Sequence, residues 1–490
     1  MQRYLHYIDG AFAEPRGGEW FDTQDPFTGE TWAQVARGGV EDIDAAVEAA
    51  HRAVTQGPWA TCSASERGAL LHRIGDLIAR DAERLALLES RNNGKTLKEM
   101  RAHLNYIPKS FYYYGGLADK VEGAVIPLDR SDYFNFTEYE PLGVVALITP
   151  WNSPLTILAW KLAPALAAGN AVVIKPSEFT SVSALELTRL CEEAGAPPGL
   201  VNVVTGFGQE VGTALVTHPK VAKVSFTGSD ATGRRIYAAA AAQMKHVTME
   251  LGGKSPNIIF DDADLDDAAN GALAGIFLSA GQSCVAGSRL LVQESIHDEM
   301  VERLAAKAKA VRLGDPRDPA THVGPIATPP QFRKVLDYLE VARAEGAVAV
   351  TGGGRSERPE CGKGWFVEPT IFKDVDSSMR IAREEVFGPV LSILRFKDEA
   401  EAIAIANDTI YGLAAAVWTR DMPRAIRMAR KLEAGTVWVN GYRPSSYLSP
   451  FGGYKQSGLG RENGIEAIRH YLQLKSVWLN IGARTPDPFA

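Results

Sequence analysis

A regular alternation of short apolar segments and helical segments between residues 143 and 260 is the feature that most constrains this fold. The helical segments, such as Leu158–Ala168 with Gly169 behind it and Ser181–Ala194, can carry the chain back across a sheet. Because strands joined by such crossovers run parallel, the pattern predicts a doubly wound parallel sheet covered on both faces. The expected strands are Val144–Ile148, Ala171–Ile174, Val201–Val204, Val221–Phe226 and Val247–Met249.

A second α/β unit is expected after residue 250. With 490 residues, the chain is longer than one hydrophobic core usually supports. The apolar segment Asn257–Phe260 begins a new alternation, which continues with helices near Ser295–Val311 and Pro330–Glu345 and a strand at Val390–Leu394. The fold class predicted is therefore α/β with two domains.

Two other regions differ from this alternation. Residues 1–37 are short strand-and-turn pieces, followed by helical runs that begin at Val40 and at Ser65, the second extending to Ser90. The segment Val121–Tyr139 is rich in β-forming residues and interrupts the helix–strand order. We expect this segment to be a β element outside both domain cores.

The composition is that of an ordinary globular protein. A net charge of −7 with no basic run gives no reason to expect nucleic-acid binding. The N-terminus lacks the apolar core of a signal peptide, and no apolar run approaches the roughly 20 residues that span a bilayer, so we expect no membrane partner and a cytoplasmic location. Four cysteines do not make a disulfide framework and fit a reducing compartment. Nine scattered histidines predict no metal site.

Two glycine-rich turns follow predicted strands. The usual dinucleotide pattern G-x-G-x-x-G is absent, and its nearest match, Gly206 to Gly212, is one residue too long and is explained at least as well by a plain turn. The second turn, Gly228 to Gly233, lies between the strand ending at Phe226 and a helix expected from about Thr232. A strand, a glycine turn and a helix N-terminus offer backbone N–H groups to a pyrophosphate.

Three short segments carry groups suited to covalent catalysis. Cys284 sits among small residues that allow a substrate to approach, Glu250 is followed by two glycines at the end of a strand, and Asn152 follows another apolar strand. Taken singly, Cys284 is typical of a buried structural thiol and Asn152 of a turn residue before Ser153-Pro154. Their combination is what favours a catalytic interpretation.

Together these segments resemble the aldehyde dehydrogenase superfamily, in its NAD(P)-dependent, non-acylating branch. The matching stretches are Gly281–Cys284, Met249–Lys254 and Pro150–Pro154. Further matches follow the family's order over nearly the whole chain, at Lys175–Glu178, Phe226–Ser229, Glu384–Pro389 and Phe451–Gly458. The resemblance implies an enzyme that oxidises an aldehyde to the carboxylic acid with NAD.

The resemblance also implies catalytic roles for particular residues. Cys284 is the expected nucleophile, and its attack on the aldehyde gives a thiohemiacetal whose oxyanion is stabilised by the Asn152 amide and the Cys284 backbone N–H. After hydride transfer, Glu250 is the expected base that activates water to hydrolyse the thioester. Lys175 is placed in both the catalytic and the cofactor set.

NAD is the expected cofactor. The Glu178 carboxylate suits the two ribose hydroxyls and repels a 2′-phosphate, although Lys175 leaves NADP open. In the resembling family, Glu385 and Phe387 match positions that hold the nicotinamide ribose and pack beside it. The cofactor set implied by the resemblance is Ile148, Pro150, Trp151, Lys175, Ser177, Glu178, Gly208, Gly212, Phe226, Gly228, Ser229, Leu251, Glu385 and Phe387.

The substrate is less constrained. Many family members with apolar substrates carry an aromatic residue where this chain has Ser153, which suggests a roomier or more polar pocket. In the variable loop Gly441–Tyr447, Arg443 is interpreted either as a carboxylate clamp for a semialdehyde or as a solvated loop arginine, while neighbouring aromatic side chains suit an aromatic or cyclic substrate. The predicted substrate set is Asn152, Trp160, Tyr442, Arg443 and Phe451.

The resemblance implies three structural parts. Residues 1–119 and 141–250 would form the dinucleotide-binding domain, 251–465 the catalytic domain, and 120–140 with 466–490 a small β oligomerisation segment in which Val477–Ile481 pairs with Val121–Tyr139. A homodimer or homotetramer is the family expectation.

The alternative functions are those of a cysteine acyltransferase or thioesterase, a CoA-acylating semialdehyde dehydrogenase, and a non-catalytic structural protein. Glu250 favours hydrolysis, because acylating relatives typically lack this glutamate.

Overall fold

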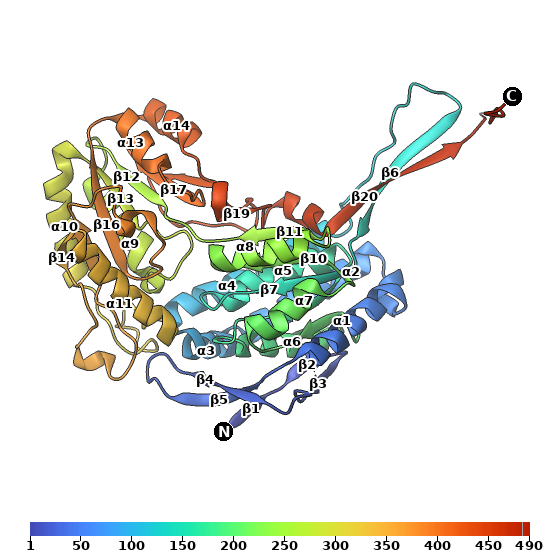
Figure 1. The fold of residues 1–490 in the computed structure, drawn as a ribbon, viewed down its shortest axis with the longest axis horizontal. Helices are drawn as coiled ribbons and strands as arrows, with labels where there is room; N and C mark the ends of the chain where they lie inside the picture. The colour runs from blue at the N-terminus through green and yellow to red at the C-terminus, as the bar shows by residue number, and fades with distance from the viewer. Residues whose placement is uncertain (483) are drawn as a thin grey trace.

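The computed structural model describes residues 1–482 and 484–490. Figure 1 shows two α/β bodies side by side and a two-stranded arm that projects away from them with the C-terminus at its tip. Each body has its own sheet and its own cluster of buried apolar side chains. The prediction of two α/β domains is therefore confirmed.

The first body is built on an eight-stranded sheet with the order β19-β11-β10-β7-β8-β9-β2-β3. Its five central strands run parallel. Of these five, β7 comes first along the chain; β8 and β9 are then added on one side of it, and β10 and β11 on the other. This order is that of a doubly wound sheet, as predicted. The central strands are β7 (Val144–Ile148), β8 (Ala171–Lys175), β9 (Val201–Val203), β10 (Val221–Thr227) and β11 (His246–Glu250).

The N-terminal residues complete this body. Strands β1 (Gln2–Tyr4), β4 (Trp20–Gln24) and β5 (Thr31–Ala36) form a separate three-stranded sheet, and β2 (His6–Ile8) with β3 (Ala11–Ala13) extends the main sheet beyond β9. Helices pack around the sheet and bury the apolar faces that the sequence pattern indicated. They are α1 (Val40–Thr55), α2 (Ala64–Arg80), α3 (Ala82–Asn93), α4 (Leu97–Leu117), α5 (Pro154–Ala167), α6 (Val182–Glu193), α7 (Thr213–Thr217) and α8 (Asp230–Ala241).

The helical run predicted from Ser65 to Ser90 is two helices. Asp81 separates α2 from α3, with backbone angles of φ −95° and ψ 9° that end one helix and start the next. A second difference lies at α5, which begins at Pro154 instead of Leu158, because proline is well suited to the first turn of a helix. The periodicity of apolar residues placed both regions in helices but did not reveal the break.

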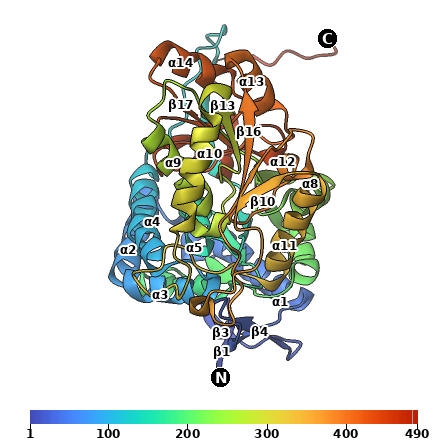
Figure 2. The same ribbon diagram turned by 90° about the vertical axis from the view of Figure 1, so that its left-hand side faces the viewer.

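The second body carries a seven-stranded sheet with the order β14-β15-β16-β13-β12-β17-β18, in which only β14 is antiparallel. Its strands are β12 (Pro256–Ile259), β13 (Arg289–Gln293), β14 (Val348–Thr351), β15 (Thr370–Lys373), β16 (Val390–Phe396), β17 (Ala414–Trp418) and β18 (Thr436–Val439). Its helices are α9 (Leu265–Phe277), α10 (His297–Lys309), α11 (Pro329–Ala344), α12 (Arg380–Arg383), α13 (Glu399–Asn407) and α14 (Met422–Lys431). Figure 2 faces this body and shows α10 in front of its sheet.

The arm consists of β6 (Tyr133–Pro141) paired antiparallel with β20 (Leu472–Asn480). The register places Phe136 opposite Val477, so the pairing that the resemblance implied between these distant segments is confirmed. Several large apolar side chains of the arm are exposed, among them Phe134, Leu474 and Trp478. A two-stranded ribbon is at best marginally stable on its own, so this surface is suited to contact with another chain.

Within residues 1–482 and 484–490, no helix has the length and apolar character needed to cross a bilayer. The same residues contain no group of three or more His, Cys, Asp or Glu side chains placed to hold a metal ion.

The short strand β19 (Gly458–Leu459) brings the chain from the second body back onto the first sheet. It pairs antiparallel with β11, placing Gly458 opposite Glu250. Gly458 has φ +148°, and a Cβ there would overlap the backbone carbonyl of Met249. This close approach requires glycine.

We therefore expect Gly458→Ala to lower the free energy of unfolding by about 2 kcal/mol or more, through backbone strain and steric overlap. Urea unfolding followed by circular dichroism measures this. Gly116→Ala is the matched control, because Gly116 lies in helix α4 with no atom within 4 Å of the place a Cβ would take, and alanine there should be neutral or stabilising. Equal stability of the two variants would contradict the strain argument.

Candidate active site

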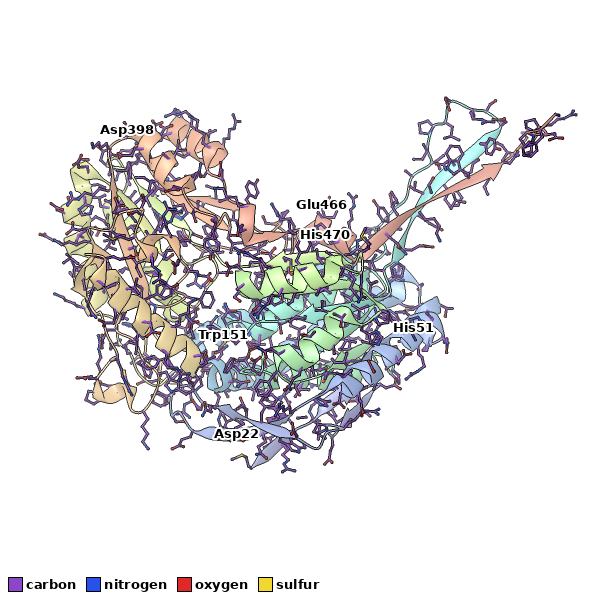
Figure 3. The ribbon with its side chains drawn as sticks, viewed as in Figure 1. Asp22, His51, Trp151, Asp398, Glu466 and His470 are labelled. Atoms are coloured by element: carbon purple, nitrogen blue, oxygen red, sulfur yellow. The ribbon has the colours of Figure 1, made fainter. Side chains whose placement is uncertain are left out.

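The candidate site lies at the edge of the first sheet where the central parallel strands end. The register pairs Ile148 with both Lys175 and Phe226, and Thr227 with Glu250, so these strand ends lie side by side. Figure 3 shows Trp151, just after β7, at the junction of the two bodies. A ligand at this edge is the arrangement that doubly wound sheets generally use.

Cys284 lies on a strained loop of the second body. Helix α9 is followed by the 3-10 turn η3 (Leu278–Gly281), in which Ser279, Ala280 and Gly281 have φ of 58°, 52° and 70°. For Ser279 and Ala280, which are not glycine, the left-handed conformation is costly and persists only where the surroundings hold it. Cys284 itself is half-buried, and its carbonyl packs so tightly on Gly253 that a Cβ there would overlap it.

Gln282 anchors this loop and was not among the predicted site residues. Its side-chain amide donates to the carbonyl of Ser279 at 3.2 Å, and its side-chain oxygen accepts from the backbone N–H of Ala327 at 2.8 Å. Its own carbonyl accepts from Asn152 Nδ2 at 3.0 Å. The buried Asn152 amide, from the first body, is thereby placed against the backbone two residues before the cysteine.

Glu250 is buried at the end of β11, and neither carboxyl oxygen has a hydrogen-bond partner among the described residues. Burial raises the pKa of this carboxyl well above its ordinary value, and the nearby Glu462 raises it further. Oε1 lies 2.8 Å from the position a Cβ on Gly452 would take. A carboxyl with a raised pKa is a stronger base once it is ionised, and without a partner it is free to turn toward water.

A buried ion pair lies behind Glu250. Lys161 Nζ donates to Glu462 and, at 3.1 Å, to Ser225 Oγ, and Thr248 Oγ1 donates to the same Ser225 oxygen at 3.0 Å. Both charged side chains are almost fully inaccessible to solvent. Sequence patterns did not predict this pair, because Lys161 and Glu462 are 301 positions apart and neither belongs to a recognisable motif.

The predicted ribose-binding residues follow β8. Lys175 is buried, and its Nζ lies 3.4 Å from a carboxylate oxygen of the half-buried Glu178. Ser177, which lies between these two residues in the sequence, is also buried. Burial lowers the pKa of the Lys175 ammonium, while Glu178 opposes this shift. A carboxylate held in place by a lysine remains able to accept hydrogen bonds from two hydroxyl groups.

The two glycine-rich turns have different geometries. Gly208–Gly212 forms a single π-helical turn (η2) that leads into α7, and neither end glycine has an atom within 4 Å of the place a Cβ would take. After β10, Gly228 packs against the ring of Phe226, and Ser229 accepts the N–H of Thr232 as the N-cap of α8. This helix begins at Asp230, two residues earlier than predicted.

These observations fit a dinucleotide. Open space beside the Gly208 and Gly212 backbone leaves room for a flat base, while the capped start of α8 offers N–H groups near the strand ends. Gly233 of α8 packs on Leu251 so closely that a Cβ would overlap that side chain. The helix is thereby held against the segment that follows Glu250.

Glu385 joins the two bodies at this edge. Its Oε1 accepts the backbone N–H of Gly253 at 2.9 Å, and its Oε2 would lie 2.6 Å from a Cβ on Gly252. Burial raises the pKa of the Glu385 carboxyl to about 7. Phe387 has φ +60° and packs edge-on against Trp151, with ring centroids 5.3 Å apart. Trp151 directly follows the predicted cofactor residue Pro150 in the sequence. These two residues, predicted from the resemblance, thus meet the segments after β7 and β11.

The predicted substrate residues lie on α5, the cysteine loop and the 441–451 loop. Trp160 on α5 packs against Phe451 with centroids 5.2 Å apart. Tyr442 donates its hydroxyl hydrogen to the carbonyl of Val285 at 2.9 Å, so this side chain braces the cysteine loop. Arg443 is half-buried, with φ 72°, and donates to the carbonyls of Ala274 and Leu278 at the end of α9.

The Cys284 thiol resists ionisation in this arrangement. Burial, together with the charges of Glu250 and Glu385, raises its pKa to about 12, and Arg443 opposes this shift. Relative to an ordinary thiol of pKa 9.0, the thiolate fraction at neutral pH falls about a thousandfold. The Cys284 thiol is therefore protonated at neutral pH.

We expect alkylation of Cys284 by iodoacetamide to accelerate about tenfold per pH unit from about pH 7 to about pH 10 without a plateau. Mass spectrometry of the modified peptide measures the rate for this cysteine alone. Free cysteine, whose rate levels off near about pH 9, is the reference compound. A plateau below that pH for Cys284 would contradict the raised pKa.

Comparisons with known proteins agree with this geometry. A model of the "Aldehyde dehydrogenase family" matches residues 12–477. The chain is 48% identical over 478 residues, 97% of each chain, to the betaine aldehyde dehydrogenase of Brucella anthropi. It is 46% identical over 477 residues, 97% of this chain and 95% of the other, to an aldehyde dehydrogenase of Emericella nidulans.

Solved structures agree as well. Betaine aldehyde dehydrogenase from Staphylococcus aureus, in complex with NAD+, has a TM-score of 0.98 at 43% identity and covers 99% of this chain and 97% of its own. The NAD+ complex of an aldehyde dehydrogenase from Bacillus cereus has a TM-score of 0.96 at 45% identity, with 98% and 97% covered. The chain therefore belongs to the aldehyde dehydrogenase family, and it is an enzyme that oxidises an aldehyde with NAD.

Proposed function

We propose that this enzyme converts an aldehyde to the carboxylic acid with NAD, with Cys284 as nucleophile, Asn152 as oxyanion donor and Glu250 as base. The observation that carries the assignment is the meeting of these three groups at one sheet edge. Asn152 from the first body contacts the Cys284 loop of the second, and Glu250 lies close enough to raise the pKa of the Cys284 thiol. A structural role alone would not require all three.

The chain's own groups perform most of the chemistry. Cys284 gives its proton to the Glu250 carboxylate, which releases it to solvent, as the sulfur bonds to the aldehyde carbon. The Asn152 amide, with its second N–H, stabilises the new oxyanion. When bound, NAD supplies the acceptor for the hydride that leaves this carbon. The carbon is then held as a thioester on Cys284. Glu250 takes a proton from water as the water attacks the thioester and returns it to the departing sulfur, so that the acid and the Cys284 thiol are released.

Preference for NAD over NADP is proposed from Glu178. A 2′-phosphate would meet its carboxylate, which Lys175 holds at 3.4 Å. Lys175 holds this carboxylate in place. Its ammonium could also attract a 2′-phosphate, so weak use of NADP is part of the proposal.

The two bodies and the arm are proposed to have separate roles. Residues 1–119 and 141–250 would bind the dinucleotide, residues 251–465 would supply the nucleophile, and residues 120–140 with 466–490 would make the contacts between subunits.

The four cysteines are all free thiols, which supports a reducing compartment such as the cytoplasm. The names of the curated relatives make betaine aldehyde one candidate substrate.

We expect Cys284→Ser to abolish NADH formation with every aldehyde, by at least about a thousandfold, since no nucleophile of comparable strength replaces the sulfur. Glu250→Gln should instead allow one rapid turnover and then stall, because the thioester is no longer hydrolysed. A stopped-flow trace of NADH absorbance separates the two. Free CoA as acyl acceptor provides the further test, since efficient turnover with CoA in the wild-type enzyme would support the acylating alternative.

We also propose that the arm makes this enzyme a homodimer or homotetramer. Its exposed Trp478, Leu474 and Phe134 would be covered in such an assembly. Trp478→Glu is expected to lower the mass measured by light scattering after gel filtration, because a charge would be buried without a partner. Met422→Glu, which changes an equally exposed apolar residue on the second body, should leave the mass unchanged. A monomeric wild-type enzyme would contradict the proposal.

A further inference from the structure

Three basic side chains lie close to the substrate side of the cysteine loop. Lys95 follows α3, His103 lies on α4 and Arg443 lies on the 441–451 loop. Burial lowers the pKa of Lys95 to about 8; Glu99 and Glu89 oppose this shift, and Arg443 adds to it. Burial likewise lowers the pKa of His103 to about 3, with Lys95 and Arg443 adding to the shift, so His103 is a neutral imidazole. Segments far apart in the chain therefore bring these groups into one electrostatic neighbourhood beside the nucleophile.

Lys95 reaches the first residue after Asn152. Its side chain is buried, and its Nζ donates to Ser153 Oγ at 2.7 Å. Ser153 is the N-cap residue of α5, so the ammonium lies one residue away from the proposed oxyanion donor. An aromatic side chain at position 153 would give the site an apolar wall. This chain instead has the Ser153 hydroxyl, with the Lys95 ammonium bonded to it.

His103 continues this polar surface one turn further along α5. Its Nδ1 lies 3.3 Å from Thr156 Oγ1. Ser153, Thr156 and Trp160 follow one another at helical spacing on α5, so two hydroxyl groups and one indole share the same face. The aromatic pair Trp160 and Phe451 covers only the far end of that face.

The nearby carboxyl groups Glu99 and Glu89 partly oppose the fall in the Lys95 pKa, but neither forms an ion pair with Lys95. Glu99 accepts from the N-cap residue Thr96 and from Ser279 Oγ at 2.9 Å. Glu89 accepts from the backbone N–H of Leu155 at 3.0 Å and from a serine hydroxyl, and burial raises its pKa to about 7. Among the described residues, no carboxylate lies within 4.0 Å of Lys95 or Arg443. A buried ammonium without an ion-pair partner is costly, and an anionic ligand would relieve the cost.

We propose that the natural substrate is an aldehyde that carries a carboxylate a few bonds from its carbonyl, held by Lys95 and Arg443 with hydroxyl donors from Ser153 and Thr156. This assignment rests on the function proposed above and names the substrate class of that site. The same groups would repel a quaternary ammonium, so the enzyme would discriminate against betaine aldehyde in spite of its relatives' names.

The test compares three small aldehydes that differ in charge: succinic semialdehyde, butanal and betaine aldehyde. NADH formation by the full-length wild-type enzyme gives kcat/KM for each. One charge-assisted contact typically changes affinity about tenfold to a hundredfold, so we expect that advantage for succinic semialdehyde over butanal and a larger one over betaine aldehyde. Equal or higher kcat/KM for butanal or betaine aldehyde would overturn this proposal only, whereas no turnover of any aldehyde would overturn the proposed function.

Two variants locate the effect. Arg443→Gln and Lys95→Met should each lower kcat/KM for succinic semialdehyde about tenfold or more relative to kcat/KM for butanal, because only the charged aldehyde loses a charge-assisted contact. Arg443 is half-buried on a loop, so its variant remains informative if Lys95→Met fails to fold. Arg420→Gln removes an exposed arginine of the second body as the control and should change nothing. Parallel loss with the charged and the neutral aldehyde would indicate structural damage and would overturn the assignment.

Discussion

Hydrogen bonds between the two bodies are the interactions on which the site depends. The nucleophile and its proposed partners come from separate hydrophobic cores, so a small shift between the bodies would separate them. Asn152 reaches the carbonyl of Gln282 across the junction, and Glu385 accepts from Gly253 in the segment that links β11 to β12. Ser457 strengthens the junction, because its carbonyl accepts from Leu251 and its hydroxyl donates to Gly252. Positioning within about 0.5 Å is what catalysis of this kind requires.

Close backbone approach makes these bonds possible. Gly253 lies against the carbonyl of Cys284, Gly458 lies against β11, and Gly252 faces Glu385. In each case a side chain would push apart two segments that meet at the site. The glycines after Glu250 therefore serve the junction as well as the turn.

Burial then sets the electrostatics of the site. Glu250 and Cys284 both have raised pKa values because little water reaches them, and the Lys161–Glu462 pair adds charge behind the base. On the substrate side, Lys95 and Arg443 have no carboxylate partner among the described residues. Acidic and basic side chains from separate segments of the chain thus act together on one thiol.

Local sequence patterns were sufficient to predict the fold class, the succession of strands and helices along the chain, and the family. Short apolar segments spaced by helices leave few topologies, and residues such as Cys284, Glu250 and Glu385 lie in motifs that are recognised directly. The remaining site residues became evident only in the folded chain. Lys161, Glu462, Lys95 and His103 lie in no such motif, and Gln282 lies in the motif of Cys284 but its contacts do not follow from that position. The partners of these residues are up to 301 positions away. Their role depends on burial and on which charges become neighbours, and these are properties of the packed chain rather than of any local segment.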